Sequence, residues 1–163
     1  KIDAFVFDFD GVMTNNLVYV DQDGKEIVSC SRADGLAFDV LRKLNKPAFI
    51  LSTEKNLVVA KRASKLGIIA IQDVPDKVKA IKKLVNSNSY NLKNILYVGN
   101  DLNDYYVMKL CGFSVCPADS HSKIIELSDI VLKTKGGNGV VRDLLENVFS
   151  IDFIEILNGV KEK

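Results

Sequence analysis

Short apolar runs alternate along the chain with segments whose apolar residues recur every three or four positions. The short runs predict strands, and the periodic segments predict amphipathic helices. Because strand and helix alternate, we expect a Rossmann-like α/β domain over residues 1–163, a doubly wound parallel sheet with helices on both faces. The expected strands are Ala4–Phe9, Ala48–Ser52, Ala70–Ile71 with its neighbours, Ile95–Val98, Phe113–Cys116 and Ile130–Leu132; the expected helices are Leu36–Leu44, Leu57–Leu66, Lys77–Val85, Tyr105–Leu110, Lys123–Leu127 and Val140–Phe149.

One segment interrupts this alternation where the first helix would be due. The stretch "LVYVDQDGKEIVSCS" (Leu17–Ser31) has two β-rich runs on either side of Asp23-Gly24, a dipeptide typical of hairpin turns. The pattern predicts a small β-hairpin insertion after the first strand. No other insertion is long enough to form a cap domain. We therefore expect a site at the strand ends to be open unless another subunit covers it.

Composition excludes some classes of partner. The chain is 47% hydrophobic and 26% charged, and its net charge is +1, so nothing in the balance favours nucleic acid or an anionic membrane. No apolar run approaches the about 18 residues of a membrane-spanning helix. Three cysteines cannot all pair within one chain, and their spacing fits no zinc site. We interpret them as reduced thiols and expect a cytoplasmic protein.

Polar residues follow several of the expected strands, where ligands bind in open α/β sheets. The stretch "AFVFDFDGVMT" ends a buried strand with two carboxylates two residues apart, which repel each other unless a cation or a proton intervenes. Hard oxygen ligands favour Mg²⁺. Hydrolysis of a phosphate monoester, which needs up to about 10²¹-fold acceleration, requires such a metal together with a nucleophile and fixed positive charge. The residues expected at this rim are Asp8, Asp10, Gly11, Thr14, Ser52, Thr53, Glu54, Lys77 and Gly99–Asp104.

Four motifs in this order resemble those of the haloacid dehalogenase-like phosphohydrolases. "DFDGVMT" is similar to the first motif, DxDGxxT, and "FILS", Lys77 and "GNDLND" are similar to the second, third and fourth. The early hairpin, Asp34-Gly35 and "GGNGVVRD" further resemble the capless phosphatases of 3-deoxy-2-keto sugar-acid phosphates. That resemblance implies a homotetramer in which hairpins and neighbouring subunits cover each other's sites.

The resemblance also implies a role for each matching residue. Asp8 is expected to be the nucleophile that forms an aspartyl-phosphate. Asp10 is expected to protonate the leaving oxygen and then activate water. Ser52 and Lys77 are expected to hold the phosphoryl oxygens. The implied Mg²⁺ ligands are Asp8, Asp10 through its backbone carbonyl, Asn100 and Asp101; the implied substrate-binding residues are Gly11, Thr14, Thr53, Glu54, Arg62 and Lys65.

The fourth motif departs from the family pattern, GDDxxD, because Asn100 replaces its first aspartate. An amide oxygen can ligate Mg²⁺ but carries no charge, so we expect weaker metal binding unless Asp101 or Asp104 contributes. A related domain fused to enzymes that activate sialic acids has GN at this point and lacks catalysis. A non-catalytic oligomerisation module of an acylneuraminate cytidylyltransferase is therefore an alternative. The chain starts at Lys1 rather than methionine, which fits a piece of a longer protein.

The second departure concerns the substrate. Phosphatases of 3-deoxy-D-manno-octulosonate 8-phosphate typically have glycine and arginine after the hydroxyl of the second motif, where this chain has Thr53-Glu54. Glu54 with Arg62 and Lys65 resembles the branch that acts on nonulosonate 9-phosphates of the sialic acid or 2-keto-3-deoxynononate type. The basic pair suits a substrate carboxylate. The nine-carbon substrate is our leading hypothesis, and the eight-carbon substrate is the alternative.

Overall fold

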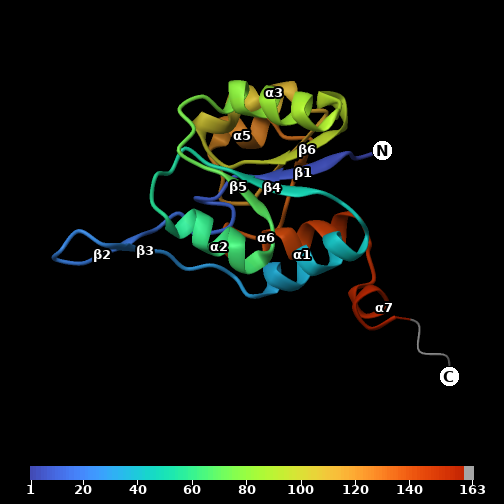
Figure 1. Cartoon of the computed structure of the whole chain (residues 1–163), viewed down its shortest axis with the longest axis horizontal. Coiled ribbons are helices and arrows are strands. Elements are labelled where there is room, and N and C mark those ends of the chain that lie inside the picture. Colours follow the sequence, from blue (N-terminus) through green and yellow to red (C-terminus); the bar gives the residue numbers. More distant parts are fainter. Residues whose placement is uncertain (160–163) are drawn as a thin grey trace.

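A six-stranded parallel sheet forms the centre of the protein, with strand order β5-β4-β1-β6-β7-β8. The structure is a computed structural model that describes residues 1–159 (Figure 1). The last four residues of the predicted domain lie outside the described range. The strands are β1 (Ala4–Phe7), β4 (Ala48–Leu51), β5 (Ile69–Ile71), β6 (Ile95–Val98), β7 (Phe113–Cys116) and β8 (Ile130–Val131). All six expected strands and the predicted fold class are confirmed.

The central position of β1 explains why it is apolar throughout. All four of its residues are buried, because β4 and β6 flank it and helices cover both faces of the sheet. Phe5 pairs with Ala48 on one side and with Leu96 on the other. The order of the strands reverses at β1, since β4 and β5 extend to one side and β6 to β8 to the other. In such sheets the crevice for ligands opens at the carboxyl ends of the strands beside this point.

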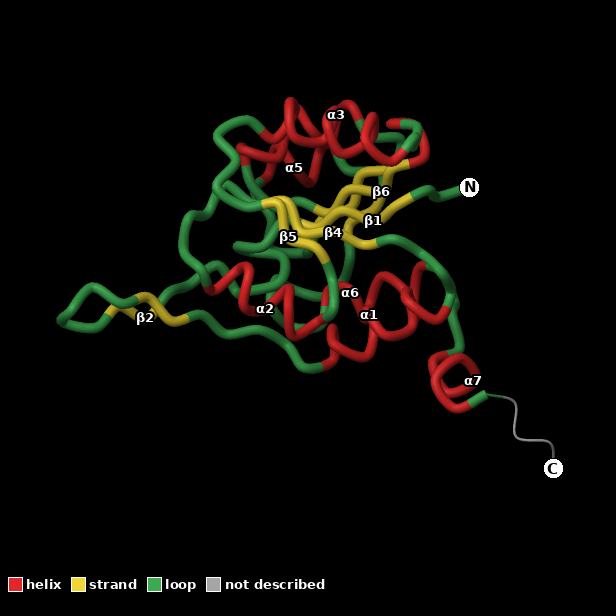
Figure 2. Tube along the Cα trace, viewed as in Figure 1, coloured by secondary structure: helices red, strands yellow, loops and turns green. Residues whose placement is uncertain are grey.

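Helices form a layer on each side of the sheet (Figure 2). Figures 1 and 2 show α3 and α5 over one face and α1, α2 and α6 over the other. Alternate residues of β1 belong to two separate cores, with Phe5 and Phe7 packed towards α1 and Ala4 and Val6 packed towards α3. The helices are α1 (Ala33–Lys43), α2 (Val58–Leu66), α3 (Lys77–Asn88), α4 (Tyr105–Leu110), α5 (Ser122–Leu127), α6 (Val140–Asp143) and α7 (Phe153–Asn158), with 3₁₀ turns at Leu92–Asn94 and Leu102–Asp104.

Helix α3 continues to Asn88, three residues beyond the predicted Val85, and two other helix boundaries differ from the expected ones for local reasons. Helix α1 begins three residues before the predicted Leu36. Ala33, Asp34 and Gly35 add no large apolar side chain to the helical period, and Asp34 is buried because it accepts a hydrogen bond from Val141 N of α6. The predicted helix Val140–Phe149 is α6 followed by a π-helical turn at Leu144–Val148. A π turn contains one extra residue, so it shifts the positions at which apolar residues face the core. A prediction based on the average helical period does not detect this shift.

The predicted hairpin is present as a narrow arm, formed by β2 (Tyr19–Val20) and β3 (Glu26–Ile27). Figure 1 shows it extending away from the body of the domain. Gly24 takes a positive φ of 78° in the turn, and Asp21 Oδ1 accepts hydrogen bonds from the backbone of residues 23 and 25. Tyr19 is 72% exposed and Ile27 is 60% exposed, so the arm presents apolar side chains to solvent.

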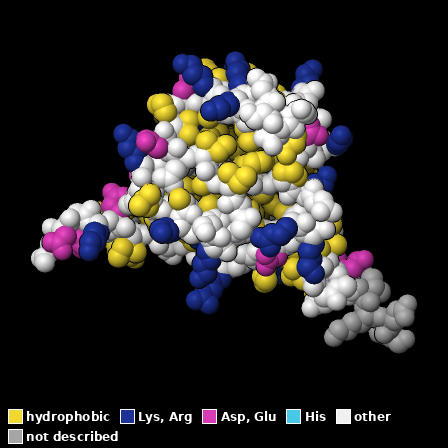
Figure 3. Space-filling view, viewed as in Figure 1, with side chains coloured by type: hydrophobic (Ala, Val, Ile, Leu, Met, Phe, Trp, Pro, Cys, Tyr) yellow, Lys and Arg dark blue, Asp and Glu magenta, His cyan; other side chains and the backbone are white. Residues whose placement is uncertain are grey.

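The surface agrees with the balanced composition. Figure 3 shows lysine and arginine side chains scattered around the rim of one face, while apolar side chains gather between its two helical layers. The three cysteines carry free thiols. Within residues 1–159, no helix is both long and apolar enough to cross a membrane.

Candidate active site

The carboxyl ends of β1, β4 and β6 bring the predicted acidic and polar residues to one rim of the sheet. Asp8 follows β1, Ser52 follows β4 and Asn100 lies two residues after β6; all three are buried. Lys77 enters from the first turn of α3, whose N-terminus is capped by Asp76 through a 3.0 Å bond from Lys79 N. The cap fixes where α3 begins, and thereby where Lys77 points.

Three buried charges lie in contact at this rim. Lys77 Nζ is 2.7 Å from Asp8 Oδ1 and 2.7 Å from Asp104 Oδ1, with all three side chains at most 6% exposed. Asp104 also accepts hydrogen bonds from Tyr97 Oη at 2.9 Å and from the backbone N–H of Asn100 at 2.9 Å. The Asp104 carboxylate is thus fully paired and cannot turn towards a metal without losing these bonds. Its role is to hold Lys77 beside Asp8.

The environment shifts the pKa values of the two acids of the first motif. The pKa of the Asp8 carboxyl is raised to about 8, chiefly by burial and next by the Asp104 charge, while Lys77 opposes the shift. Burial disfavours the charged form of Lys77, but the two carboxylates outweigh burial and raise its pKa. Burial and the charge of Glu54 raise the pKa of Asp10. A raised pKa suits Asp10 to hold and deliver a proton, whereas Asp8 needs further positive charge to act as a carboxylate nucleophile.

The loop after β1 is held by hydrogen bonds and by close glycine contacts. Thr14 Oγ1 accepts bonds from the backbone N–H of Gly11 at 3.1 Å and of Asn16 at 3.2 Å. Gly11 has a φ of 84°, which favours glycine. Gly136 lies against it, since a Cβ at Gly136 would overlap the Gly11 carbonyl oxygen. The "GGNG" turn therefore packs backbone to backbone on the loop that carries both acids.

The Asn100 amide of the fourth motif meets two oxygen atoms of the first motif at the spacing that Mg²⁺ ligands take. The amide of Asn100 has two terminal atoms, and the one farther from Gly11 is called its outer atom. This outer atom lies 2.8 Å from the Asp10 carbonyl oxygen and 3.2 Å from Asp8 Oδ2. Neighbouring ligands of octahedral Mg²⁺ are about 3.0 Å apart, given bonds of roughly 2.1 Å. A Cβ on Gly11 would overlap the Asn100 amide, so glycine leaves the space that this arrangement needs. Residues 1–159 hold no cluster of three His, Cys, Asp or Glu side chains that could bind a metal, so the fit depends on Asn100 and the backbone carbonyl.

Comparison with known proteins agrees with this geometry. A family model of haloacid dehalogenase-like hydrolases matches residues 49–144. The chain is also 32% identical to the 3-deoxy-D-manno-octulosonate 8-phosphate phosphatase of Salmonella typhi over 147 residues, which are 90% of this chain and 78% of that protein. The chain belongs to the haloacid dehalogenase-like hydrolase family. The predicted family and the enzyme class, a phosphoric monoester hydrolase, are confirmed.

Solved structures place the hydrolase among similar folds. A Streptomyces avermitilis protein named for the HAD hydrolase family is 40% identical with a TM-score of 0.87, and the match covers 89% of this chain and 83% of that one. The 3-deoxy-D-manno-octulosonate 8-phosphate phosphatase from Moraxella catarrhalis, in complex with magnesium ion, phosphate ion and KDO, is 26% identical with a TM-score of 0.85, covering 96% and 88%. The magnesium in that complex agrees with the predicted cofactor.

The second motif of this hydrolase lies next to β5. Ser52 is 1% exposed, its backbone N–H donates to Ile71 O at 2.9 Å, and its Oγ accepts from Glu54 N at 3.1 Å. The Ser52 hydroxyl proton is free of that bond and can be donated to a phosphoryl oxygen. Glu54 Oε1 accepts from the backbone N–H groups of residues 55 and 56, at 2.7 and 2.8 Å. Glu54 therefore shapes the loop before α2 as well as carrying charge, while Thr53 is exposed.

The predicted basic pair lies on α2 and meets a third cation that sequence reasoning missed. Arg62, Lys65 and Arg32 line a cavity of about 240 Å³ with Gly35 and Leu66. Arg62 Nη2 donates to Ser31 O at 2.9 Å, which ties α2 to the segment after the hairpin. Three cations around one cavity favour an anionic group such as a carboxylate. No acidic side chain lines this cavity among the residues described.

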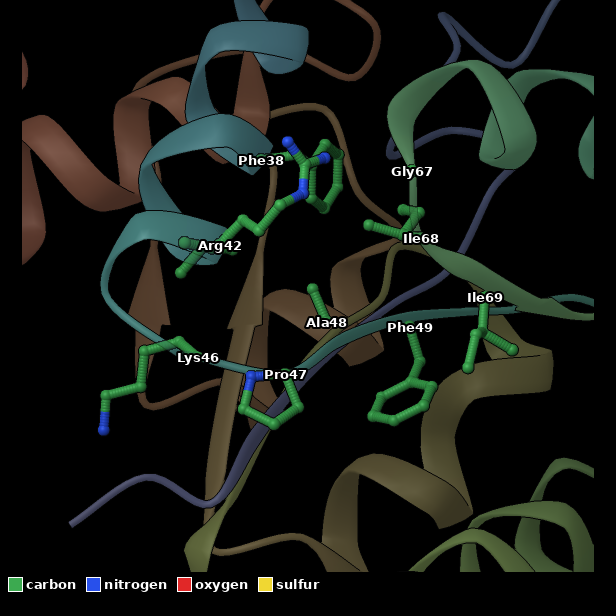
Figure 4. A pocket seen from close by; sticks show the side chains of 10 residues that line it. Phe38, Arg42, Lys46, Pro47, Ala48, Phe49, Gly67, Ile68 and Ile69 are labelled. Carbon is green, nitrogen blue, oxygen red and sulfur yellow. The ribbon is translucent and has the colours of Figure 1, made fainter. Parts of the chain in front are cut away.

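Another cavity, of about 220 Å³, lies at the opposite ends of the strands (Figure 4). It is lined by Phe38, Ala48, Phe49 and Ile68 among others, at the amino ends of β4 and β5. Figure 4 shows largely apolar side chains around it, with Arg42 and Lys46 as its charged members. The cavity therefore belongs to the packing of the sheet edge and not to the acidic rim.

Other predicted residues have contacts that the motifs did not reveal. Asp101 is exposed and its Oδ1 accepts from Leu102 N at 2.7 Å, so its role as a metal ligand stays a prediction. Tyr97 and Asp34 were missed as supports of the site. Asp34 Oδ1 accepts from Val141 N at 2.9 Å and so holds the start of α6, directly after the "GGNG" turn. A fully buried tyrosine at the end of an apolar strand gives no signal in sequence that it contacts an acid.

Proposed function

We propose that this hydrolase removes the terminal phosphate of a 3-deoxy-2-keto sugar acid with Mg²⁺ as cofactor. The observation that supports it most strongly is the contact of Lys77 with both Asp8 and Asp104, since Asp8 shares the loop after β1 with Asp10. Asp8 Oδ1 accepts bonds from Lys77 and from the backbone N–H of Phe9, and Asp8 Oδ2 faces the Asn100 amide, so the carboxylate lies between the phosphate-holding lysine and the expected metal position. The proposal rests on the chemistry of these side chains.

The reaction follows from the position of each group. A carboxylate oxygen of Asp8 forms a bond to phosphorus as the ester oxygen leaves, and Asp10 gives that leaving oxygen its proton. Asp10 then takes a proton from water, which attacks the aspartyl-phosphate, releases inorganic phosphate and restores Asp8. Lys77 and the Ser52 hydroxyl hold the phosphoryl oxygens throughout. Bound Mg²⁺ supplies the charge that keeps Asp8 ionised and neutralises the phosphate.

The residues that would hold Mg²⁺ are Asp8, Asp10 through its backbone carbonyl, and Asn100. Asp8→Asn is the direct test of the mechanism, because an amide keeps the shape but cannot attack phosphorus. Phosphate release by this variant should fall to background, while its circular dichroism spectrum stays that of the wild type. Turnover near the wild-type level in Asp8→Asn would refute the role of Asp8. Absence of turnover in the wild type at saturating Mg²⁺ would instead favour the non-catalytic module.

Two substrates remain candidates, each favoured by a different observation. Relatives named as 3-deoxy-D-manno-octulosonate 8-phosphate phosphatases favour the eight-carbon sugar acid. Glu54, together with the cavity lined by Arg62 and Lys65, favours a nonulosonate 9-phosphate. Comparing kcat/KM for the two substrates decides between them. Glu54→Gln keeps an oxygen for the two backbone bonds at this loop and removes the charge, so it should lower kcat/KM selectively for the nine-carbon substrate.

The exposed hairpin arm supports assembly into the predicted homotetramer. Leu17 is 66% exposed, Tyr19 is 72% exposed and Ile27 is 60% exposed, an unusual density of apolar surface for so small an element. A second copy of the chain is the partner that this proposal requires, and cytoplasmic location stays a prediction. Light scattering should give a tetramer for the wild type and a smaller species after Tyr19→Ser and Ile27→Ser together.

A further inference from the structure

We propose that the Asn100 side chain stands in for the cation when the protein is free of metal, and gives up that place by rotation of its amide. The proposal rests on the magnesium site of the proposed function but not on turnover. It concerns the position where this chain departs from the pattern of its family. An aspartate at position 100 could act as a ligand, yet it could not replace the metal.

The contacts of the Asn100 amide carry the proposal. Its outer atom lies 2.8 Å from the Asp10 carbonyl oxygen and 3.2 Å from Asp8 Oδ2, both of which are acceptors. With nitrogen at that position, the amide donates two hydrogen bonds and links the loop after β6 to the loop after β1. With oxygen at that position, the same atom faces two other oxygens, which is favourable only around a cation.

The rest of Asn100 is fixed, so rotation of the amide is the available change. Its backbone N–H donates to Asp104 Oδ2 at 2.9 Å, and its carbonyl accepts from His121 N at 2.9 Å. The residue is 6% exposed, and Gly11 packs against the inner side of its amide. Rotation by half a turn about the last side-chain bond exchanges donor for acceptor and leaves the side chain in the same volume.

Electrostatics makes the amide and a carboxylate behave in opposite ways here. An aspartate at position 100 would place a second carboxylate beside that of Asp8 and against the Asp10 carbonyl oxygen, so the metal-free fold should lose stability or take up a proton. The same added charge should strengthen metal binding, because the affinity of oxygen-ligand sites follows the number of charged ligands. Asn100 therefore gives a site that is assembled without metal and binds metal weakly.

The test compares the wild type with Asn100→Asp and with Asn103→Asp. Asn103 is exposed in the same loop, so its variant adds an equal charge without adding it to the oxygen cluster. In excess chelator, Asn100→Asp should melt at a lower temperature than both other proteins. In Mg²⁺ titrations, calorimetry should show that Asn100→Asp binds at least about tenfold more tightly than the wild type, with a larger rise in melting temperature.

Two further measurements keep the proposal testable if Asn100→Asp folds poorly. Asn100→Ala should also melt at a lower temperature in chelator, but it should gain less from Mg²⁺ than the wild type does. In ¹⁵N NMR spectra of the wild type, the side-chain amide pair assigned to Asn100 through these variants should shift on addition of Mg²⁺. Unfolding of Asn100→Asp in chelator with recovery in Mg²⁺ also supports the proposal.

Several results would overturn the inference. Three results contradict an amide that occupies the site: a melting temperature of Asn100→Asp equal to that of the wild type in chelator, no loss of stability in Asn100→Ala there, or Asn100 amide signals that do not shift on addition of Mg²⁺. Equal Mg²⁺ affinity in Asn100→Asp and the wild type contradicts the claim that Asn100 weakens metal binding. None of these measurements uses substrate. A protein that passes them all and releases no phosphate would refute the proposed function alone.

Discussion

Replacing Tyr97 by phenylalanine tests whether the buried hydroxyl supports the charges of the active site. Tyr97 is fully buried, and its Oη donates a 2.9 Å bond to Asp104 Oδ1, the same atom that contacts Lys77. Tyr97→Phe removes this bond and leaves the ring in place, so no large cavity forms. The substitution therefore isolates one charge-assisted hydrogen bond.

The size of the effect follows from what remains around Asp104. A hydrogen bond to a charged group contributes about 1.5–3 kcal/mol. Asp104 keeps Lys77 and two backbone donors, so we expect the lower part of that range, about 1.5–2 kcal/mol. For a domain of this size, the melting temperature should fall by roughly 3–8 °C.

The assay is urea denaturation of Tyr97→Phe and of Tyr106→Phe, a matched control whose side chain is 71% exposed. The control should stay within about 0.5 kcal/mol of the wild type. In an Asp104→Asn background, Tyr97→Phe should cost less, because the acceptor has lost its charge. An effect of Tyr97→Phe as small as that of the control, or unchanged by Asp104→Asn, would refute the assigned contact.

Three more predictions concern other parts of the site. Lys77→Met leaves the carboxylates of Asp8 and Asp104 without their cation, so the protein should lose about 3–5 kcal/mol of stability, and more at higher pH. Phosphate release should also fall at least about 10²-fold. Turnover at the wild-type rate would contradict the role of Lys77 in holding the phosphoryl group. Gly136→Ala should lower both kcat and stability, because its Cβ would overlap the Gly11 carbonyl oxygen, whereas Gly35→Ala, whose Cβ has room, should raise stability by about 0.5–1 kcal/mol in denaturation assays. Burial raises the pKa of the Asp34 carboxyl from 3.8 to about 6, so the folded state binds this proton more tightly than the unfolded state does. As pH falls from about 7 to about 4, the wild type should therefore gain up to about 3 kcal/mol of stability relative to Asp34→Asn. A stability difference between the two proteins that does not change with pH would contradict the raised pKa.

The elements and the position of the site could be predicted because their causes are local. Apolar runs bounded by polar residues predict strands, and Asp23-Gly24 predicts the hairpin turn. The acids that follow β1 are expected at the carboxyl ends of the strands wherever a sheet is parallel. The family motifs then indicate a role for Asp8, Asp10 and Lys77. These predictions needed only neighbours in the chain and one topological rule.

The partners of each charge could not be predicted, because they lie far apart in the sequence. Lys77 and Asp104 are 27 residues apart, and Asp34 and Val141 are 107 apart. Which residues meet depends on the order of the strands and on the depth at which each side chain is buried, and neither is encoded by local periodicity. The sequence alone thus determined the layered fold, the motifs and the kind of chemistry. Only the tertiary structure decided that Lys77 is shared by two carboxylates and that the Asn100 amide faces Asp8 and Asp10, since low-dielectric contacts of this kind exist only once the chain has folded.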